Sequence, residues 1–194
     1  MEQTREQWLN KAAGQLARRV FKPAALALPE KLRVSCGWPS KKALSPNGRA
    51  LAQCFDAGCS DDGTIEVFVS PVLAERLDVL AAFTHELLHA AVGPDAKHGS
   101  PFKQGMAAIG LEGKATSTEV HKGSALWEKL EATAEAVGEY PHARLDKESL
   151  PKQSTRLLKV ECPKCGYTVR VTHKWLDVGT PTCCCGTKMK ETEV

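Results

Sequence analysis

The pattern of hydrophobic and polar positions predicts an opening helix followed by three strands. Apolar residues recur at helical spacing from Thr4 to Val20, Thr4 and Gln7 resemble a capping box, and Pro23 should end the helix. Three later segments alternate apolar and polar residues, as half-buried strands do, and Asp61-Asp62-Gly63 is a turn sequence that favours a hairpin of the second and third. The expected strands cover residues 32–36, 50–55 and 65–69.

The next part of the chain is predicted to be mostly helical. Ser70-Pro71 resembles a helix start, and the Leu- and Ala-rich segment that follows should end at Gly93-Pro94. Ser100-Pro101 begins a shorter helix that ends near Gly110. Residues 112–123 are polar and without periodicity, so we expect a loop there, and a last helix should span residues 124–137.

These elements predict an α+β fold with two domains. The first should cover residues 1–143 and end just after Tyr140-Pro141-His142. Residues 144–157 are rich in polar side chains, include Pro151, and are expected to be a linker. Residues 158–194 hold five of the eight cysteines and should form a small separate module.

Composition argues against disordered and membrane proteins. Of the 194 residues, 42% are hydrophobic, which suffices for a buried core. The longest apolar run, around Val79 to Phe83, is far shorter than the ~20 residues that span a bilayer. The charged N-terminal segment does not resemble a signal peptide. We therefore expect a cytoplasmic protein with no membrane partner, in which clustered thiols indicate metal binding rather than disulfides, and we expect it to be a monomer.

The net charge of +3 conceals an uneven distribution. Residues 1–50 carry +7, residues 51–150 carry −8, and residues 151–194 carry +4. Basic ends can contact the phosphate backbone of a nucleic acid, so DNA is an expected partner. The alternative is that these lysines and arginines are solvated surface residues without a partner.

The predicted long helix contains an HExxH sequence, His85-Glu86-Leu87-Leu88-His89. Residues four apart share a helix face, so both imidazoles can bind one cation while Glu86 points toward a water molecule beside them. Zn²⁺ suits neutral imidazole and lowers the pKa of bound water toward ~7, and the glutamate takes the proton as the water attacks a carbonyl. The alternative, a solvent-facing polar stripe, fits poorly with the strongly apolar helix around it.

Such a site needs a third ligand, for which the sequence offers several candidates. His98 follows Gly93-Pro94, where the chain can turn back over the helix end. Asp95 has the spacing of the third ligand in metzincin-type proteases but lacks their preceding glycine. Glu128 or Glu131 would imitate the thermolysin arrangement. We favour His98, because it keeps the ligands uniform and its neighbours supply a turn, a helix cap and an apolar residue.

Two motifs follow one another in the chain, His85-Glu86-x-x-His89 and then His98-Gly99-x-x-Phe102. Together they resemble the HExxH…HGxxF signature of the SprT-like zinc metallopeptidases, the family that includes Spartan. Further segments resemble its compact phage and bacterial branch: Ser35–Ser40, Phe68–Pro71, Gly110–Gly113 and Tyr140–His142. The resemblance covers about residues 15–190. It implies a minimal zincin-like domain with an N-terminal helix, a three-stranded sheet and an HExxH helix. It also implies zinc on His85, His89 and His98, Glu86 as catalytic base, and a bacterial or phage-infected cell as the location. Spartan digests proteins crosslinked to DNA, which is a property of that relative.

The C-terminal cysteines have the pattern of a zinc ribbon. Cys162-Pro163-Lys164-Cys165-Gly166 is a zinc-knuckle sequence, and Cys183-Cys184-Cys185-Gly186 follows after a β-like run. Thr182 stands where a second C-x-x-C would have cysteine, so two of three thiols must serve as ligands. Cys183 with Cys185 is preferred, Cys184 with Cys185 is the alternative, and a redox-active thiol pair is a rival interpretation.

This module would take a structural zinc ion, so two zinc sites are expected in the chain. A stabilising role is the simplest, because so short a segment cannot build a core without metal. The second hypothesis is contact with nucleic acid, through cations interleaved with aromatic side chains. The candidate contacts are Lys164, Arg170, Lys174 and Trp175.

Two histidines remain outside these sites. We expect His121 to be exposed in a loop, whereas His142 either packs against the domain or donates a hydrogen bond to an oxyanion in the cleft. The leading hypothesis is a zinc-dependent endopeptidase that acts on DNA-associated or DNA-crosslinked proteins. The alternatives are a non-catalytic zinc-containing module that binds nucleic acid or acts as an adaptor, and a zinc hydrolase that acts on a non-peptide bond.

Overall fold

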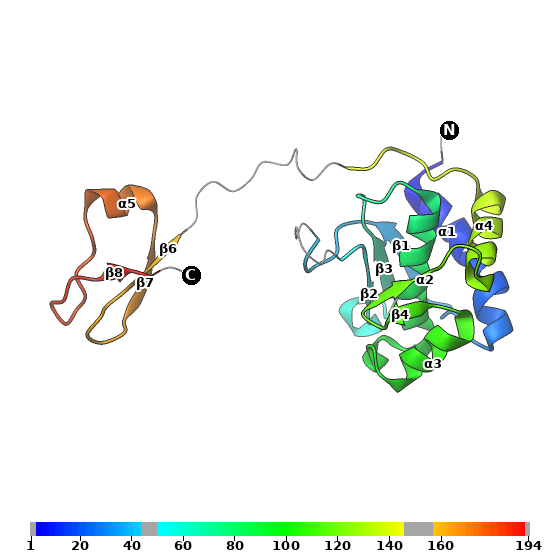
Figure 1. Ribbon diagram of the computed structural model, residues 1–194, viewed down its shortest axis with the longest axis horizontal. Helices are drawn as coiled ribbons and strands as arrows, with labels where there is room; N and C mark the ends of the chain where they lie inside the picture. Colours follow the sequence, from blue (N-terminus) through cyan, green and yellow to red (C-terminus); the bar gives the residue numbers. More distant parts are fainter. Residues whose placement is uncertain (1–2, 44–49, 146–156, 193–194) are drawn as a thin grey trace. The chain divides into compact units, whose positions relative to one another are not determined.

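The computed structural model describes residues 3–43, 50–145 and 157–192, and the chain divides into two compact units, Met1–Glu148 and Ser149–Val194 (Figure 1). The fold is α+β, with five α-helices and three small sheets among the described residues. The predicted linker lies mostly outside these residues. No helix in the described ranges is both long enough and apolar enough to cross a membrane.

The opening helical segment covers the predicted residues, but only its first part is α-helical. Helix α1 spans Arg5–Leu16 and begins with the expected capping box, in which Thr4 and Gln7 each accept a hydrogen bond from the backbone N–H of the other. The chain then continues through a π-helical turn and a 3₁₀ turn, so Pro23 does not stop it. A proline is tolerated there because the first turn of a helix does not use its N–H. These two turns are Ala17–Phe21 and Lys22–Ala24.

The three predicted strands are confirmed and form one sheet. They are β1 (Leu32–Cys36), β2 (Ala52–Phe55) and β3 (Ile65–Val69). Strand β3 is central: it pairs with β2 in antiparallel orientation, as the predicted hairpin requires, and with β1 in parallel orientation. Among the described residues β2 is therefore an edge strand.

Helix α2 spans Arg76–Val92 and begins later than Ser70-Pro71. The reason is that the N–H of Ser70 donates to the carbonyl of Leu51, which continues the strand pairing beyond β3. Residues 71–75 then form turns, and the helix starts only after Glu75. The prediction of a helix start at Ser70 is wrong: Ser70 still belongs to the strand pairing, which its local sequence does not indicate.

The later helices match their predictions, but the predicted loop does not. Helices α3 (Ser100–Ile109) and α4 (Ala125–Val137) are confirmed, and Gly110 ends α3 with a φ of 87°. The polar stretch between them contains a hairpin of β4 (Glu112–Lys114) and β5 (Ser117–Glu119). Its residues are mostly exposed, so the hairpin lacks the alternating apolar pattern that predicts strands.

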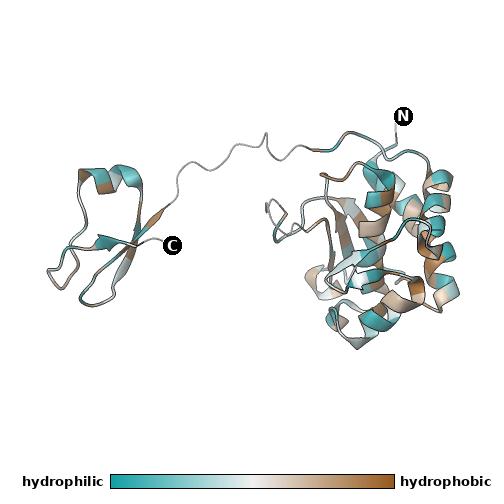
Figure 2. Cartoon of the chain, in the orientation of Figure 1, coloured by the Kyte–Doolittle hydropathy of each residue, from teal (hydrophilic) through white to brown (hydrophobic). Residues whose placement is uncertain are grey.

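Helix α2 lies at the centre of the first unit, where it contacts β2, β3, α3 and α4 (Figure 1). Its core-facing side chains are fully buried, and hydrophobic positions recur along the helices of this unit (Figure 2). The apolar contacts therefore hold the helix that carries the HExxH sequence. The buried side chains of α2 that join the core are Val79, Leu80, Phe83, Leu87 and Leu88.

Hydrogen bonds close the start of the first unit onto its end. The guanidinium of Arg5 donates to the carbonyls of Pro141, at 3.3 Å, and Ala143, at 2.5 Å, and lies over the ring of Tyr140. The indole N–H of Trp8 donates to the carbonyl of Gly138 at 3.0 Å. Helix α1 thus holds the segment that follows α4.

The second unit is a small three-stranded sheet with a short helix. Strand β6 (Leu158–Glu161) lies between β7 (Thr168–Val171) and β8 (Lys190–Glu191), and α5 (His173–Val178) follows β7. Its buried core consists of Val160, Cys162, Cys183 and Met189. Val169, Val171 and Leu176 pack against it partly buried, so the apolar core of this unit is small.

Candidate functional site

Three imidazoles converge in the first unit. His85 and His89 come from α2, one helical turn apart, and His98 comes from the loop after it. The Nε2 atom of His98 lies 3.2 Å from Nε2 of His89 and 3.5 Å from Nε2 of His85. All three offer a ring nitrogen within 4.8 Å of the others. The structure thus brings together the three residues that the sequence indicated, which we call the three-histidine group.

The nitrogen spacing fits a tetrahedral metal ion. Zn–N bonds of about 2.0–2.1 Å at tetrahedral angles require ligand nitrogens about 3.3–3.4 Å apart. The two Nε2 separations, 3.2 and 3.5 Å, bracket that value. Three such ligands leave the fourth position open, which is the arrangement of catalytic rather than structural zinc sites. The three-histidine group could therefore hold a metal ion.

A strained turn returns His98 to the helix. Gly93 has a φ of 89° and Lys97 a φ of 45°, both in the left-handed region. The N–H of Gly99 donates to the carbonyl of Ala96 at 2.8 Å, and a Cβ at position 99 would lie 2.9 Å from that oxygen. Glycine is therefore needed at position 99, and the turn that was predicted next to His98 is present for a steric reason.

Burial keeps the helix histidines neutral. It lowers the pKa of His85 to about 4 and that of His89 to about 3, and the neighbouring imidazoles contribute through charge repulsion. Burial also lowers the pKa of His98. Because only the neutral ring has a free lone pair, all three are ready metal ligands at neutral pH.

Glu86 lines the same cavity as the three histidines. Burial raises its pKa to about 7, and a hydrogen bond to the backbone of Cys54 on β2 opposes that rise. A carboxyl group with a pKa near the working pH can both accept and return a proton, as a general base must. The burial of Cys54, together with the charge of Glu86, raises the pKa of that thiol to about 12, so it remains protonated.

Phe102, the apolar residue of the predicted motif, supports the imidazoles. Its side chain is fully buried on α3, and its ring stacks on His89 with centroids 4.3 Å apart. Its centroid also lies 5.0 Å from that of His85 and 5.1 Å from that of His98. One aromatic ring therefore packs against all three candidate ligands.

The site opens into a cavity of about 560 Å³. Strand β2 and the residues before it form one part of the lining, and the β4–β5 hairpin supplies Thr116, Ser117 and Thr118. The hydroxyl of Thr118 lies 2.9 Å from Nδ1 of His85. Sequence reasoning missed Thr118, because nothing in an aperiodic polar stretch indicates which hydroxyl faces a site 33 residues earlier.

The other sequence candidates lie elsewhere. Asp95, Glu128 and Glu131 do not join the metal-binding group found among the described residues. His121 is exposed, as predicted, and lies 3.4 Å from a carboxylate oxygen of Glu112. His142 lines a different cavity, beside Arg5, so it is not in position to donate to an oxyanion at the HExxH site.

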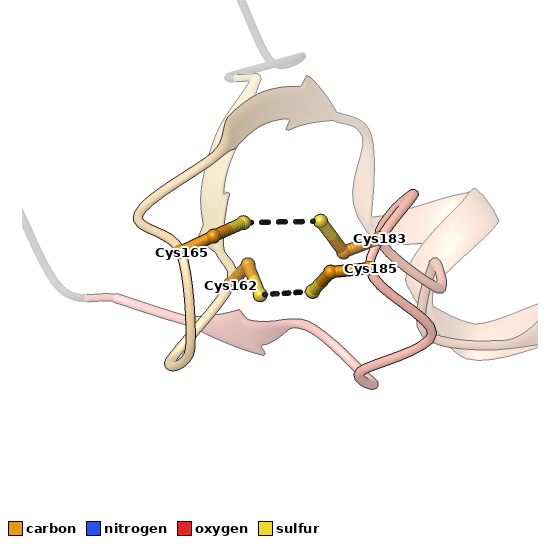
Figure 3. Close-up of side chains that lie close together, drawn as sticks. All are labelled: Cys162, Cys165, Cys183 and Cys185. Atoms are coloured by element: carbon orange, nitrogen blue, oxygen red, sulfur yellow. Dashed lines mark hydrogen bonds between the residues drawn. The ribbon is translucent and has the colours of Figure 1, made fainter.

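Four thiols converge in the second unit (Figure 3). The sulfur atoms of Cys162 and Cys185 are 3.5 Å apart, and those of Cys165 and Cys183 are 3.4 Å apart. Tetrahedral Zn–S bonds of about 2.3 Å place sulfur atoms about 3.8 Å apart. The observed separations exceed by far the ~2.05 Å of a disulfide. This four-cysteine group is thus a second candidate metal site.

Cys184 lies outside this group, so the structure favours Cys183 with Cys185 over the alternative pair. Its thiol is exposed and 3.8 Å from the sulfur of Cys183. Hydrogen bonds with the side chain and backbone of Thr187 lower the pKa of Cys185 to about 6. A hydrogen bond with the backbone of Tyr167 opposes the rise of the Cys165 pKa, but hydrogen bonds with the thiols of Cys183 and Cys162 outweigh it and raise that pKa to about 12.

The second unit exposes two aromatic side chains, Tyr167 (54% exposed) and Trp175 (60% exposed). The ammonium of Lys174 lies 5.2 Å from the centroid of the Trp175 ring. Lys164 and Arg170, the other candidate contacts, are also exposed. A solvated ring with a cation over it is a surface on which a base can stack.

Comparisons with protein-family models, with curated proteins and with solved structures found no match to this chain.

Proposed function

We propose that this chain is a zinc-dependent endopeptidase of the SprT-like type and that its first unit is a minimal zincin-like domain. The observation that carries the proposal is the convergence of three neutral imidazoles and Glu86 on one cavity beside an edge strand. A purely structural metal site has no need of an open fourth position or of a buried carboxyl group beside it.

His85, His89 and His98 would hold the zinc ion. When bound, zinc acts as a Lewis acid that polarises a peptide carbonyl and acidifies water. The chain itself supplies the proton transfer: the carboxylate of Glu86 takes a proton from the attacking water and returns it to the leaving amine nitrogen. A pKa of about 7 in the metal-free site makes both transfers accessible to this side chain.

Strand β2 supports a peptide rather than a small-molecule substrate. Ala52, Gln53 and Cys54 line the cavity, and β2 pairs with β3 on one side only among the described residues. Apart from the N–H of Cys54, which donates a hydrogen bond to Glu86, the N–H and C=O groups of its free edge can hydrogen-bond an extended peptide, which adds a strand to the sheet. Such pairing contacts the backbone of the substrate more than its side chains, so it suits an enzyme of broad sequence preference.

The decisive variant is Glu86→Gln, which keeps the shape of the side chain and removes its basicity. We expect proteolysis of an unfolded protein to fall by about 10²–10⁴-fold, the usual contribution of a general base. Zinc content should stay at two ions per chain. Glu128→Gln, on α4 and outside the metal-binding group, is the matched control and should cleave like wild type. Equal cleavage by Glu86→Gln and wild type would exclude the mechanism.

We further propose that the ribbon binds single-stranded nucleic acid and brings the enzyme to DNA-associated proteins. The exposed Trp175 ring and the cation of Lys174 support stacking with charge neutralisation. The alternative, a non-catalytic nucleic-acid-binding or adaptor module, shares this surface. It is favoured if a labelled oligonucleotide binds while neither wild type nor Glu86→Gln cleaves any protein.

The ribbon surface is tested by Trp175→Ala. Loss of one stacking aromatic costs about 1–3 kcal/mol, so the affinity for a fluorescent single-stranded oligonucleotide should fall about 5- to 150-fold. Val178→Ala is the matched control, because Val178 lies on the same helix and is 77% exposed. An unchanged affinity of Trp175→Ala, or an equal loss in both variants, would contradict the assignment.

A further inference from the structure

The imidazole of His85 has a different partner at each ring nitrogen. Its Nε2 atom faces the other histidines, 3.5 Å from Nε2 of His98, and its Nδ1 atom lies 2.9 Å from the hydroxyl oxygen of Thr118. A ring that binds a metal through Nε2 carries its proton on Nδ1. The Nδ1–H of His85 therefore donates to Thr118, whose hydroxyl oxygen accepts.

The β4–β5 hairpin presents Thr118 to the site in a defined register. Thr118 pairs with Gly113, whose φ is 80° and whose missing Cβ would lie 3.2 Å from the carbonyl of Ser117. Ser117 and Glu119, on either side of Thr118, are exposed, whereas Thr118 is partly buried. The hairpin thus turns the hydroxyl of Thr118 toward His85 on α2.

The other two histidines lack a support of this kind. In the parts of the chain that the structure describes, Nδ1 of His89 and Nδ1 of His98 form no hydrogen bond. His89 is held by stacking on Phe102 instead. The orientation of His85, whose ring centroid is 5.0 Å from that of Phe102 at a tilt of 56°, depends more on its polar contact.

We propose that Thr118 is a positioning residue for the metal site: by accepting from Nδ1 it fixes the His85 ring, holds the proton away from Nε2 and strengthens metal binding. The inference rests on the proposed function only in requiring zinc at the three-histidine group. The proposal gives the exposed β4–β5 hairpin a role in the site, because a hydrogen bond then joins this part of the cavity lining to His85. Loss of a hydrogen-bond partner of this type costs about 10–100-fold in metal affinity.

The test compares Thr118→Val and Thr118→Ser in the full chain. Valine keeps the shape of threonine and removes the acceptor, whereas serine keeps it. Zinc affinity is measured by competition with a chelator, and His89→Ala identifies which of the two binding steps belongs to the three-histidine group. We expect Thr118→Val to bind zinc there about 10–100-fold more weakly, with serine close to wild type and binding at the four-cysteine group unchanged. Thr116→Val, which alters another hydroxyl of the same cavity, is the matched control.

A second readout follows the proton itself. Long-range ¹⁵N–¹H correlation spectra of the zinc-free chain should show His85 protonated on Nδ1 in wild type and in Thr118→Ser, and a mixture of tautomers in Thr118→Val. Unchanged affinity and tautomer in Thr118→Val would overturn the proposal, as would an equal loss in Thr118→Ser or Thr116→Val. If the wild-type chain binds zinc only at the four-cysteine group, the proposed function itself fails. If wild type binds zinc at the three-histidine group but Thr118→Val does so equally well, only the role of Thr118 fails.

Discussion

Replacement of Phe102 by alanine separates the stability of the first unit from the quality of its metal site. The ring is fully buried and contacts all three imidazoles, with centroid separations of 4.3, 5.0 and 5.1 Å. Its removal leaves a cavity directly behind the three-histidine group. The rings of His85, His89 and His98 then gain room to tilt away from their common centre.

The expected loss of stability follows from the burial. Truncation of a fully buried phenylalanine to alanine costs about 3–5 kcal/mol, a large part of the roughly 5–15 kcal/mol that stabilises a typical domain. Phe21→Ala should cost a similar amount, because Phe21 is equally buried but forms no ring contact with the three histidines. The difference between the two variants then lies in metal binding alone.

The assay is urea unfolding of each variant with and without saturating zinc. Each tenfold loss of affinity lowers the zinc-dependent gain in unfolding free energy by about 1.4 kcal/mol. We expect the gain of Phe21→Ala to match wild type and that of Phe102→Ala to be smaller by about 1–3 kcal/mol, the equivalent of a roughly 10- to 100-fold weaker site. An equal zinc-dependent gain in the two variants would refute the reasoning that Phe102 orders the ligands.

Three further predictions concern other parts of the chain. The pKa values of His85 and His89, about 4 and about 3, lie below the ordinary 6.5, so these side chains bind protons more readily in the unfolded chain and acid destabilises the fold; the raised pKa of Glu86 offsets the effect of about one histidine. The unfolding free energy of the zinc-free protein, measured in urea, should therefore fall by on the order of 2 kcal/mol from about pH 6.5 to about pH 5. A rise over this range would contradict the prediction. Cys162→Ser should unfold the second unit and leave one zinc ion per chain by elemental analysis, because a structural zinc contributes on the order of 10 kcal/mol to folding. Cys184→Ser is the control and should keep both ions. Loss of zinc from Cys184→Ser would exclude the assigned ligand set. Arg5→Leu should lower the unfolding free energy of the first unit by about 2–3 kcal/mol through its lost bonds to two carbonyls, and Arg19→Leu, an exposed control, should not.

Local signals in the sequence predicted much of the fold. The strands around Val34 and Val67 alternate apolar and polar residues, and the capping box at Thr4 marks a helix start, because each signal arises within a few residues of the chain. The site was predictable for the same reason: the spacing of HExxH places two imidazoles on one helix face. His98 required one further step, the return of the chain at Gly93.

Features that depend on distant partners were not predictable. The start of α2 is set by the hydrogen bond from Ser70 to Leu51, and the parallel pairing of β1 with β3 joins segments that are not adjacent in sequence. The hairpin that carries Thr118 buries almost nothing, so its strands have no hydrophobic pattern. The residues missed by sequence reasoning are therefore those whose role is defined by tertiary contacts alone.

The closure of α1 onto the segment after α4 affects how the first unit is made. Arg5 and Trp8 donate hydrogen bonds to carbonyls in residues 138–143, at least 130 positions later, and Arg5 donates one more to the sulfur of Cys36. During synthesis on the ribosome, helix α1 therefore cannot complete its contacts until almost the whole first unit has emerged. Contacts of such long sequence separation slow folding and favour a single late transition. Helix α2 packs against α4 as well as against β2, β3 and α3, so its full set of contacts forms only after α4 has emerged.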